Sequence, residues 1–221
     1  MDFVIGIVLY EPDWGSLLPR LQSILNIPIY VYDNSAQQAH PQAFNKIKKQ
    51  SNLFYQYMGF NQGICEPYQM LVESNIEFNY FITLDQDSLA DGKFIQKLIQ
   101  EFKEYQLSEP LKFHNSSQDS AITVGVFAPF HQVFEGQLPS SERFREVQAM
   151  MSSGSILNRS AILAVGGFDE RFWLDGFDHD YCLSLRHMGY QIIMANRVIL
   201  EHPLGEVIKK KLLWQIHPRE Y

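Results

Sequence analysis

The sequence predicts an α/β fold with a mostly parallel central sheet flanked by helices. Short apolar runs typical of buried strands alternate with segments of helical periodicity, at the spacing of βαβ units. Polar residues stand directly after several of these runs. The chain has 221 residues, of which 46% are hydrophobic and 19% charged, so it can bury a sizeable core.

The first half of the chain contains four strand–helix pairs. Strands are predicted at residues 3–10, 29–33, 53–58 and 80–84, and helices at 16–25, 41–49, 63–74 and 92–105. Turn residues Pro12 and Gly15 separate the first strand from the first helix, and Gly59 ends the third strand. The fourth helix is predicted by its apolar spacing, at Phe94, Ile95, Leu98, Ile99 and Phe102.

The second half is less regular. Residues 108–120 are polar and rich in Ser and Asn, which predicts a surface loop, and residues 131–146 lack periodicity, which predicts an irregular, mobile excursion. Strands are expected at 121–128, 152–158, 191–194 and 198–200, and helices at 159–165 and 178–188. Gly189, just past the last of these helices, is a common C-terminal stop.

Composition excludes several classes of protein. The formal net charge of -7 argues against general nucleic-acid binding, which needs a basic face. Cys65 and Cys182 form no CxxC pair or zinc spacing and indicate a reducing compartment. The N-terminus lacks the regions of a signal peptide, and no apolar stretch is long enough to span a membrane. A soluble, cytoplasmic protein is therefore expected.

Polar side chains gather after the predicted strands. Glu11, Asp33 and Asn61 follow the first three, and Asp85 and Asp87 follow the fourth. Ligands of open parallel sheets sit outside the carboxyl ends of the strands, so these residues are candidates for one shared site. Asp and Asn also favour ordinary turns, which is the competing interpretation.

Asp85 and Asp87 are spaced one residue apart, so in an extended chain both carboxylates point to the same side. Such oxygen donors suit Mg²⁺ or Mn²⁺, which usually bind together with phosphates. An acidic turn or helix cap remains open. A calcium EF-hand loop fails because Ala90 and Gln96 occupy its glycine and glutamate positions. A haloacid-dehalogenase motif usually opens its fold, whereas three strands precede this one.

A second acidic cluster precedes the helix at 178–188. Asp175, Asp178 and Asp180 lie close to Trp173 in the sequence. One aspartate would suffice as a helix N-cap, whereas three beside aromatic residues indicate a site that stacks and deprotonates a sugar. His202 follows the last strand and is a candidate to complete a metal shell with Asp87, although a lone histidine is more often structural.

Several motifs occur together in one order, and this order resembles the family 2 inverting glycosyltransferases of GT-A fold. The motifs are GIVLYEP, VYDNS, NQG, LDQDS, SSGS, GGFDERFWLD, FDHDYCLSLR and HMGY. The resemblance runs from about Phe3 to His202. Within the family, the DQDS form and the HxxG at His202 to Gly205 look most like bacterial rhamnosyltransferases that use dTDP-L-rhamnose.

The resemblance implies a role for each matching residue. Asp178 matches the catalytic base and Asp87 the metal ligand, with Mg²⁺ or Mn²⁺ as cofactor. Trp173 and Asp175 are implied to lie near the acceptor. Donor-binding roles are implied for six positions: Tyr10, Glu11, Asp33, Asn61, Gly63 and Asp85.

These inferences combine into one expectation. Residues 1–205 are expected to form a single GT-A catalytic domain that moves a hexosyl group, best L-rhamnose, onto a bacterial cell-surface glycan or lipid-linked saccharide. Residues 206–221 are expected to form a tail that is truncated or membrane-proximal, and its lysines next to apolar residues fit peripheral contact with the inner face of the membrane. A sugar-phosphate nucleotidyltransferase and an inactive sugar-binding module stay open as alternatives.

Overall fold

The computed structural model describes residues 2–38, 41–47, 49–108, 123–133 and 136–201. Within them, one sheet has the strand order β3-β2-β1-β4-β7-β5-β8-β6. The strands are β1 (Phe3–Leu9), β2 (Ile29–Asp33), β3 (Leu53–Tyr57), β4 (Tyr80–Asp85), β5 (Val124–Gln132), β6 (Phe144–Glu146), β7 (Ile156–Asn158) and β8 (Gln191–Glu201).

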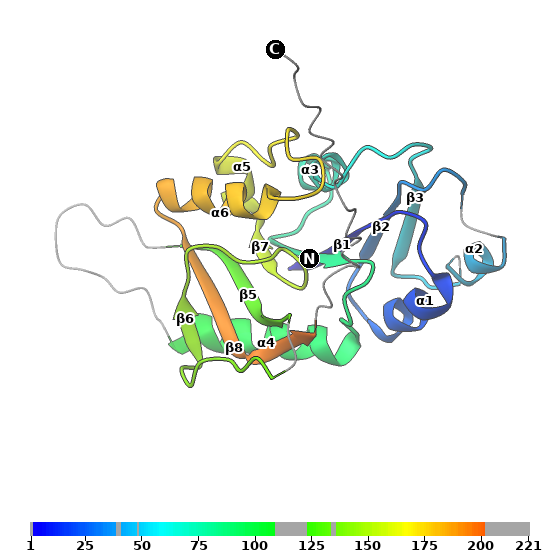
Figure 1. The fold of residues 1–221 in the computed structure, drawn as a ribbon. Coiled ribbons are helices and arrows are strands. Elements are labelled where there is room, and N and C mark those ends of the chain that lie inside the picture. Colours follow the sequence, from blue (N-terminus) through cyan, green and yellow to red (C-terminus); the bar gives the residue numbers. More distant parts are fainter. Residues whose placement is uncertain (1, 39–40, 48, 109–122, 134–135, 202–221) are drawn as a thin grey trace, which may run out of the picture.

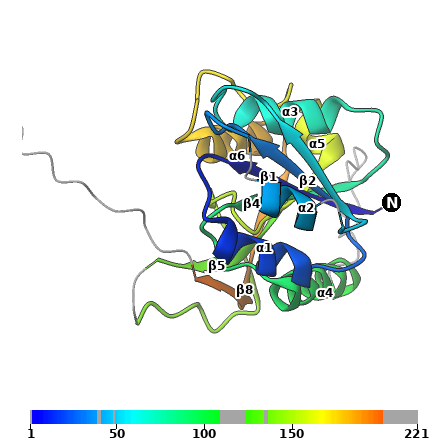
Figure 2. The same ribbon diagram turned by 90° about the vertical axis from the view of Figure 1, so that its right-hand side faces the viewer.

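Helices cover both faces of the sheet (Figures 1 and 2). They are α1 (Trp14–Ser23), α2 (Pro41–Ile47), α3 (Cys65–Glu73), α4 (Gly92–Ser108), α5 (Arg159–Ala164) and α6 (Phe177–His187). In both views α3, α5 and α6 lie on one side of the sheet, and α1 and α4 lie on the other. No helix in the described part of the chain is both long enough and apolar enough to cross a bilayer.

The sheet is mostly parallel, as predicted. The pairs β1–β2, β2–β3, β1–β4 and β5–β8 are parallel, whereas β7 pairs antiparallel with β4 and β5, and β6 pairs antiparallel with β8. The chain passes from β1 to β2 and β3 on one side and then returns to β4 on the other. A reversal of this kind leaves a crevice at the carboxyl ends of the two strands beside it.

The second half of the chain departs from the prediction at several points. The two strands expected at 191–194 and 198–200 are one strand, β8, which pairs with β5 across a register shift between Pro129 and Phe130. The excursion expected at 131–146 contains the end of β5 and all of β6, because β8 offers β6 an edge that only the folded sheet creates. The strand expected at 152–158 is regular only over residues 156–158.

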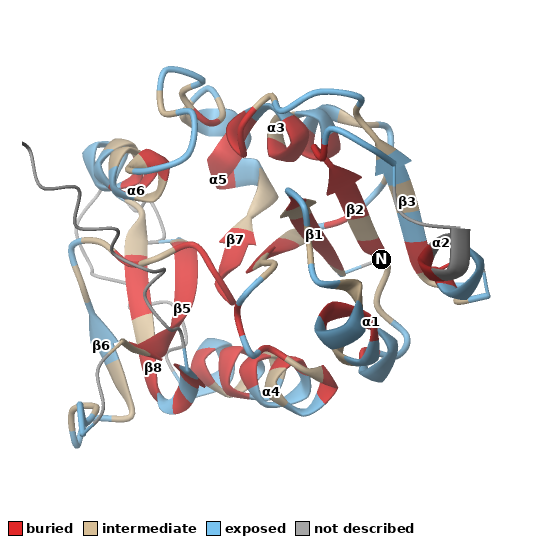
Figure 3. Ribbon diagram, turned by 45° about the vertical axis from the view of Figure 1, so that its right-hand side comes forward, coloured by how far each residue is buried: buried red, intermediate tan, exposed pale blue. Residues whose placement is uncertain are grey.

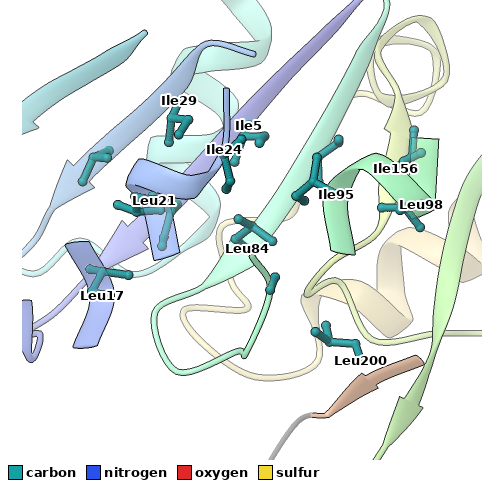
Figure 4. Packing of buried hydrophobic residues seen from close by; sticks show 14 of the residues in the cluster. Ile5, Leu17, Leu21, Ile24, Ile29, Leu84, Ile95, Leu98, Ile156 and Leu200 are labelled. Atoms are coloured by element: carbon teal, nitrogen blue, oxygen red, sulfur yellow. The ribbon is translucent and has the colours of Figure 1, made fainter. Parts of the chain in front are cut away.

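Two apolar clusters pack on opposite faces of the sheet. One joins α1 and α4 to the sheet and includes Leu17, Leu21, Ile95 and Leu98, which point toward Leu84 and its neighbours in Figure 4. The other lies under α3, α5 and α6. Figure 3 shows the central strands buried and the outer helix faces exposed. Because helices cover both faces of the sheet, the ends of the strands are where its polar groups reach solvent.

Candidate donor and acceptor site

Gln86 ties the ends of β1 and β4 together. Its side-chain carbonyl accepts a hydrogen bond from the Tyr10 N–H at 2.8 Å, and its amide donates to the Tyr10 carbonyl at 3.1 Å. Arg20 of α1 donates to the Gln86 backbone carbonyl at 2.7 Å. The Tyr10 side chain stays half-exposed above this contact. The central residue of the DQD turn is therefore a structural tie between the two strand ends.

Asp85 and Asp87 lie on either side of this tie at the carboxyl end of β4. Asp85 is half-buried and Asp87 is exposed. Ser88 closes the turn, because its hydroxyl and its N–H both donate to the Asp85 carbonyl oxygen, at 2.9 and 3.3 Å. Burial lowers the pKa of Arg20, and the nearby charge of Asp87 works in the opposite direction.

The described residues around Asp87 fit a Mg²⁺ or Mn²⁺ ion that is shared with a diphosphate. They contain no group of three or more side chains able to hold a metal by themselves. Mg²⁺ in phosphate-transfer sites commonly takes only one or two protein carboxylates and fills its shell with phosphate oxygens and water. Asp87, with Asp85 beside it, supplies that kind of incomplete donor set.

At the end of β2, Asp33 is buried and already bonded. One carboxylate oxygen accepts the Ser35 N–H at 3.0 Å and the other accepts the Tyr55 hydroxyl at 2.5 Å. Glu11, at φ 47°, donates its N–H to the Ser35 hydroxyl and accepts the Ala36 N–H on its carboxylate. Both residues are thus fixed by hydrogen bonds at the carboxyl ends of β1 and β2, and their roles toward a nucleotide remain predictions.

Asn61 and Gly63 form a loop that docks on the end of β2. The side-chain amide oxygen of Asn61 accepts the Gly63 N–H at 3.1 Å. The Asn34 amide donates to the Gly63 carbonyl at 2.7 Å and reaches Asn61 at 3.4 Å. Asn61 itself is exposed and Gly63 is buried. The loop is therefore fixed next to the strand ends, with Asn61 at its open side.

Asp178 lies in the first turn of α6. The N-cap of this helix is Gly176, at φ 85° and without a side-chain cap hydrogen bond, so none of the three nearby aspartates caps the helix. The side chain of Asp178 is 18% exposed. Its two oxygens accept the His179 N–H at 2.8 Å and the Ser152 N–H at 3.3 Å. The carboxylate is thus oriented and still reachable.

Ser152 and Ser153 bring the two acidic groups together. The Ser152 N–H bonds to Asp178, and the hydroxyl of the next residue, Ser153, accepts the Asp85 N–H at 3.1 Å. The same short segment is anchored to β4, because the Thr83 hydroxyl donates to the Ser152 carbonyl and the Gly154 N–H donates to the Thr83 carbonyl at 2.7 Å. The backbone at the end of β4 and the carboxylate of Asp178 on α6 therefore contact consecutive residues of one segment.

Trp173 and Asp175 lie in the loop before α6, and both are exposed. The side of this loop that faces α3 is apolar. Burial raises the pKa of the Cys65 thiol to about 12, with smaller contributions from the surrounding carboxylates, among them Asp169 and Asp178. Such a thiol stays protonated, so Cys65 does not act as a nucleophile there.

Two expectations lie outside the described residues. These are the metal role of His202 and the membrane contact of residues 206–221. The sequence gives no signal that Arg20 helps to hold the site together. It shows Ser152 and Ser153 only as part of a motif. The tie that Gln86 makes to Tyr10 joins residues 76 positions apart.

Solved structures of nucleotide-sugar transferases share this architecture. S. aureus TarS in complex with UDP-GlcNAc matches at a TM-score of 0.67 and 14% identity, over 94% of this chain and 60% of TarS. GalNAc-T7 with UDP, GalNAc and Mn²⁺ matches at 0.69 and 11% identity, over 92% of this chain and 44% of that one. The chain therefore has the GT-A fold.

The chain also resembles a known transferase in sequence. The chain is 23% identical over 211 residues to the dTDP-rhamnosyl transferase RfbF of Shigella flexneri, covering 90% of this chain and 68% of that protein. No protein-family model matches it. The chain thus spans about two thirds of this relative, and 60% or less of the two solved structures described above.

Proposed function

We propose that this protein is an inverting glycosyltransferase that transfers a hexosyl group from a nucleotide diphosphate to a saccharide acceptor. The GT-A fold and the acidic residues at the carboxyl ends of its strands support this proposal. The best candidate donor is dTDP-L-rhamnose. It is supported by the similarity to a dTDP-rhamnosyl transferase and by the DQDS sequence at Asp85 to Ser88.

One observation carries the proposal. The segment Ser152–Ser153 contacts the carboxylate of Asp178 through one residue and the backbone of Asp85 through the next. A displacement at a sugar carbon needs the leaving group on one side and the base for the incoming hydroxyl on the other. The contacts of Asp178 and of the backbone at the end of β4 with consecutive residues of one segment support such an arrangement.

In the proposed reaction Asp178 accepts the proton of the acceptor hydroxyl as that oxygen attacks the anomeric carbon. The bond from this carbon to the diphosphate oxygen breaks at the same time, so the configuration inverts. Asp87, with Asp85 and His202 as candidate partners, would hold Mg²⁺ or Mn²⁺. The bound ion would neutralise charge on the departing diphosphate. Tyr10, Glu11, Asp33, Asn61 and Gly63 would bind the donor, and Trp173 and Asp175 the acceptor.

A panel of nucleotide sugars tests the proposal. The protein is incubated with Mn²⁺ and dTDP-L-rhamnose, UDP-GlcNAc, UDP-glucose or GDP-mannose. Release of the nucleoside diphosphate and the shift in melting temperature are both measured. We expect the largest release and shift with dTDP-L-rhamnose. If no nucleotide sugar is hydrolysed and none raises the melting temperature, the proposal is wrong.

The same panel separates the alternatives. A raised melting temperature with no turnover of any donor or acceptor would favour an inactive sugar-binding module. Formation of dTDP-rhamnose from dTTP and rhamnose 1-phosphate would favour a nucleotidyltransferase. That reaction usually uses a basic, Gly-rich loop after the first strand, whereas this turn carries Glu11 and Asp13.

The acceptor and the cellular location belong to the same proposal. A bacterial cell-surface glycan or its lipid-linked precursor would be the acceptor, and the protein would work in the cytoplasm at the inner face of the membrane. The similarity to RfbF supports the bacterial setting. Sedimentation with liposomes tests the membrane contact: binding that does not depend on anionic lipid would argue against it.

A further inference from the structure

The loop before α6 is held by the segment that leads into α3. The Ile64 N–H donates to the Trp173 carbonyl at 3.0 Å. The Cys65 thiol donates to the Phe172 carbonyl at 3.1 Å. Two consecutive carbonyl groups of this loop are therefore bonded to two consecutive residues of the other segment, across more than 100 positions of sequence.

Gly63 lies directly against Trp173. A Cβ added to Gly63 would lie 2.3 Å from the Trp173 carbonyl oxygen, and 2.7 and 3.0 Å from the indole Cδ1 and Nε1 atoms. Contacts this short are not tolerated, so the indole edge rests on a surface that only glycine provides. Trp173 is nevertheless 52% exposed. One part of its side chain is seated and the remainder is presented to solvent.

The loop is held at a second point as well. The Phe168 N–H donates to the side-chain carbonyl of Gln69 on α3 at 3.2 Å. A Cβ on Gly167 would lie 2.3 Å from the same oxygen. The start and the middle of the loop are thus both docked on α3 and its N-terminal segment, which limits the positions that Trp173 can take.

We propose that Gly63 is a positioning residue for Trp173, because its missing side chain leaves room for the indole to pack against it. The loop of Asn61 and Gly63, which is proposed to bind the donor, would then also hold the aromatic ring on which the acceptor sugar stacks. That the ligand stacked on Trp173 is an acceptor sugar rests on the proposed function. Gly63 is bonded through its carbonyl to Asn34 and through its N–H to Asn61. One short loop therefore connects the donor side to the indole. A pre-positioned indole loses little conformational entropy when a sugar stacks on it.

The test compares Gly63→Ala with Gly59→Ala. Gly59 has a similar left-handed backbone, φ 82° against 77°, but a Cβ there meets nothing within 4 Å. Both variants suffer the same backbone strain, and only Gly63→Ala disturbs Trp173. Trp14→Phe and Trp214→Phe leave Trp173 as the one tryptophan in the chain. Its fluorescence is then quenched with acrylamide, which reports how far the indole is exposed.

We expect the quenching constant to rise in Gly63→Ala, by about twofold if the half-buried side chain becomes fully exposed, and to stay unchanged in Gly59→Ala. With an alkyl glycoside that the parent glycosylates, KM for the acceptor should rise in Gly63→Ala and stay at the parental value in Gly59→Ala.

Unchanged quenching in Gly63→Ala would overturn the proposal, since the indole would then not depend on Gly63. A rise in the acceptor KM of the same size in Gly59→Ala would also overturn it, because a Cβ on Gly59 meets nothing within 4 Å. The quenching measurement needs no substrate. If the parent protein hydrolyses no nucleotide sugar and none raises its melting temperature, the proposed function is refuted, while the quenching measurement still tests the packing of Trp173 against Gly63.

Discussion

At the scale of single residues, the site depends on which polar groups are already occupied. Gln86 uses its whole amide on the backbone of Tyr10, and Asp33 uses both oxygens on Ser35 and Tyr55. Asp87 is exposed, and Asp178 is partly exposed and held by two N–H groups. Asp87 and Asp178 thus keep some access to solvent at the positions where the proposed chemistry needs a charge.

Asp178→Asn tests the base. The amide oxygen can keep one of the two hydrogen bonds from Ser152 and His179, and α6 does not depend on a side-chain cap, so the fold should persist. We expect the transfer rate to fall by about 10²- to 10⁴-fold, because an amide cannot take the proton. The affinity for dTDP with Mn²⁺, measured by calorimetry, should be unchanged. Asp180→Asn, two residues along the same helix, is the matched control, and a variant at Asp178 that turns over like the parent would disprove the assignment.

Removal of the metal tests Asp87. Treatment with EDTA should abolish donor hydrolysis, and added Mg²⁺ or Mn²⁺ should restore it, because the diphosphate would otherwise leave without charge compensation. Asp87→Ala should need a higher metal concentration for half-maximal activity, whereas Glu77→Ala, at an exposed site away from the strand ends, should behave as the parent. Full activity of the parent in chelator would contradict the metal role.

At the scale of elements, Arg159 fixes the C-terminal end of α3. Its guanidinium donates to the carbonyls of Val72, Ser74 and Ile76 at 3.0, 2.8 and 2.7 Å, and lies 4.3 Å from the centre of the Phe78 ring. The last carbonyls of a helix have no partner within the helix. A side chain of α5 thus secures α3, whose other end carries the loop that seats Trp173.

Arg159→Ala should lower the free energy of unfolding by about 2–4 kcal/mol, since three charge-assisted hydrogen bonds and their buried carbonyl partners are affected together. Urea denaturation followed by circular dichroism measures it. Arg197→Ala removes an arginine from an exposed position of β8 and should cost little. Equal losses in both variants would show that Arg159 does not secure α3.

At the scale of the whole molecule, burial in the apolar layers on the two faces of the sheet keeps two cysteine thiols and a tyrosine hydroxyl protonated. Burial raises the pKa of Cys65 to about 12 from 9.0, of Cys182 to about 11 from 9.0, and of Tyr32 to about 12 from 10.0. In the unfolded chain these groups would ionise at their ordinary values. Folding is therefore linked to pH on the alkaline side.

Since these native pKa values lie above the unfolded ones, their contribution to stability is complete below pH 9 and is lost as the pH rises toward 12. The free energy of unfolding, measured in urea at pH 8 and pH 10.5, should be lower at the higher pH. Cys182→Ala should show a smaller decline than the parent, although it is less stable at both. A decline of the same size would exclude Cys182 as a contributor.

The local sequence pattern was sufficient to predict the strands in the first half of the fold. Strands β1, β2, β3 and β4 lie within one residue of their predicted ends, because each is a short apolar run bounded by turn residues. Parallel strands bring their carboxyl ends to one edge, and Asp33 and Asp85 do end β2 and β4, whereas the roles of Asp33, Asp85 and Asp87 stay predictions. The two strands expected at 191–194 and 198–200 are one strand because β5 pairs with β8 on both sides of an irregularity, with Pro129 opposite Ala195 and Phe130 opposite Ile199.

The sequence alone determined the order of the elements, the buried faces of the sheet and the acidic residues that stand at its edge. All of these depend on the spacing of side chains along a few neighbouring positions. Only the tertiary structure decided which of those residues remain available and what orients them. The bonds from Gln86 to Tyr10, from Ser152 to Asp178 and from Ile64 to Trp173 join segments far apart in the chain, and no local pattern encodes such contacts.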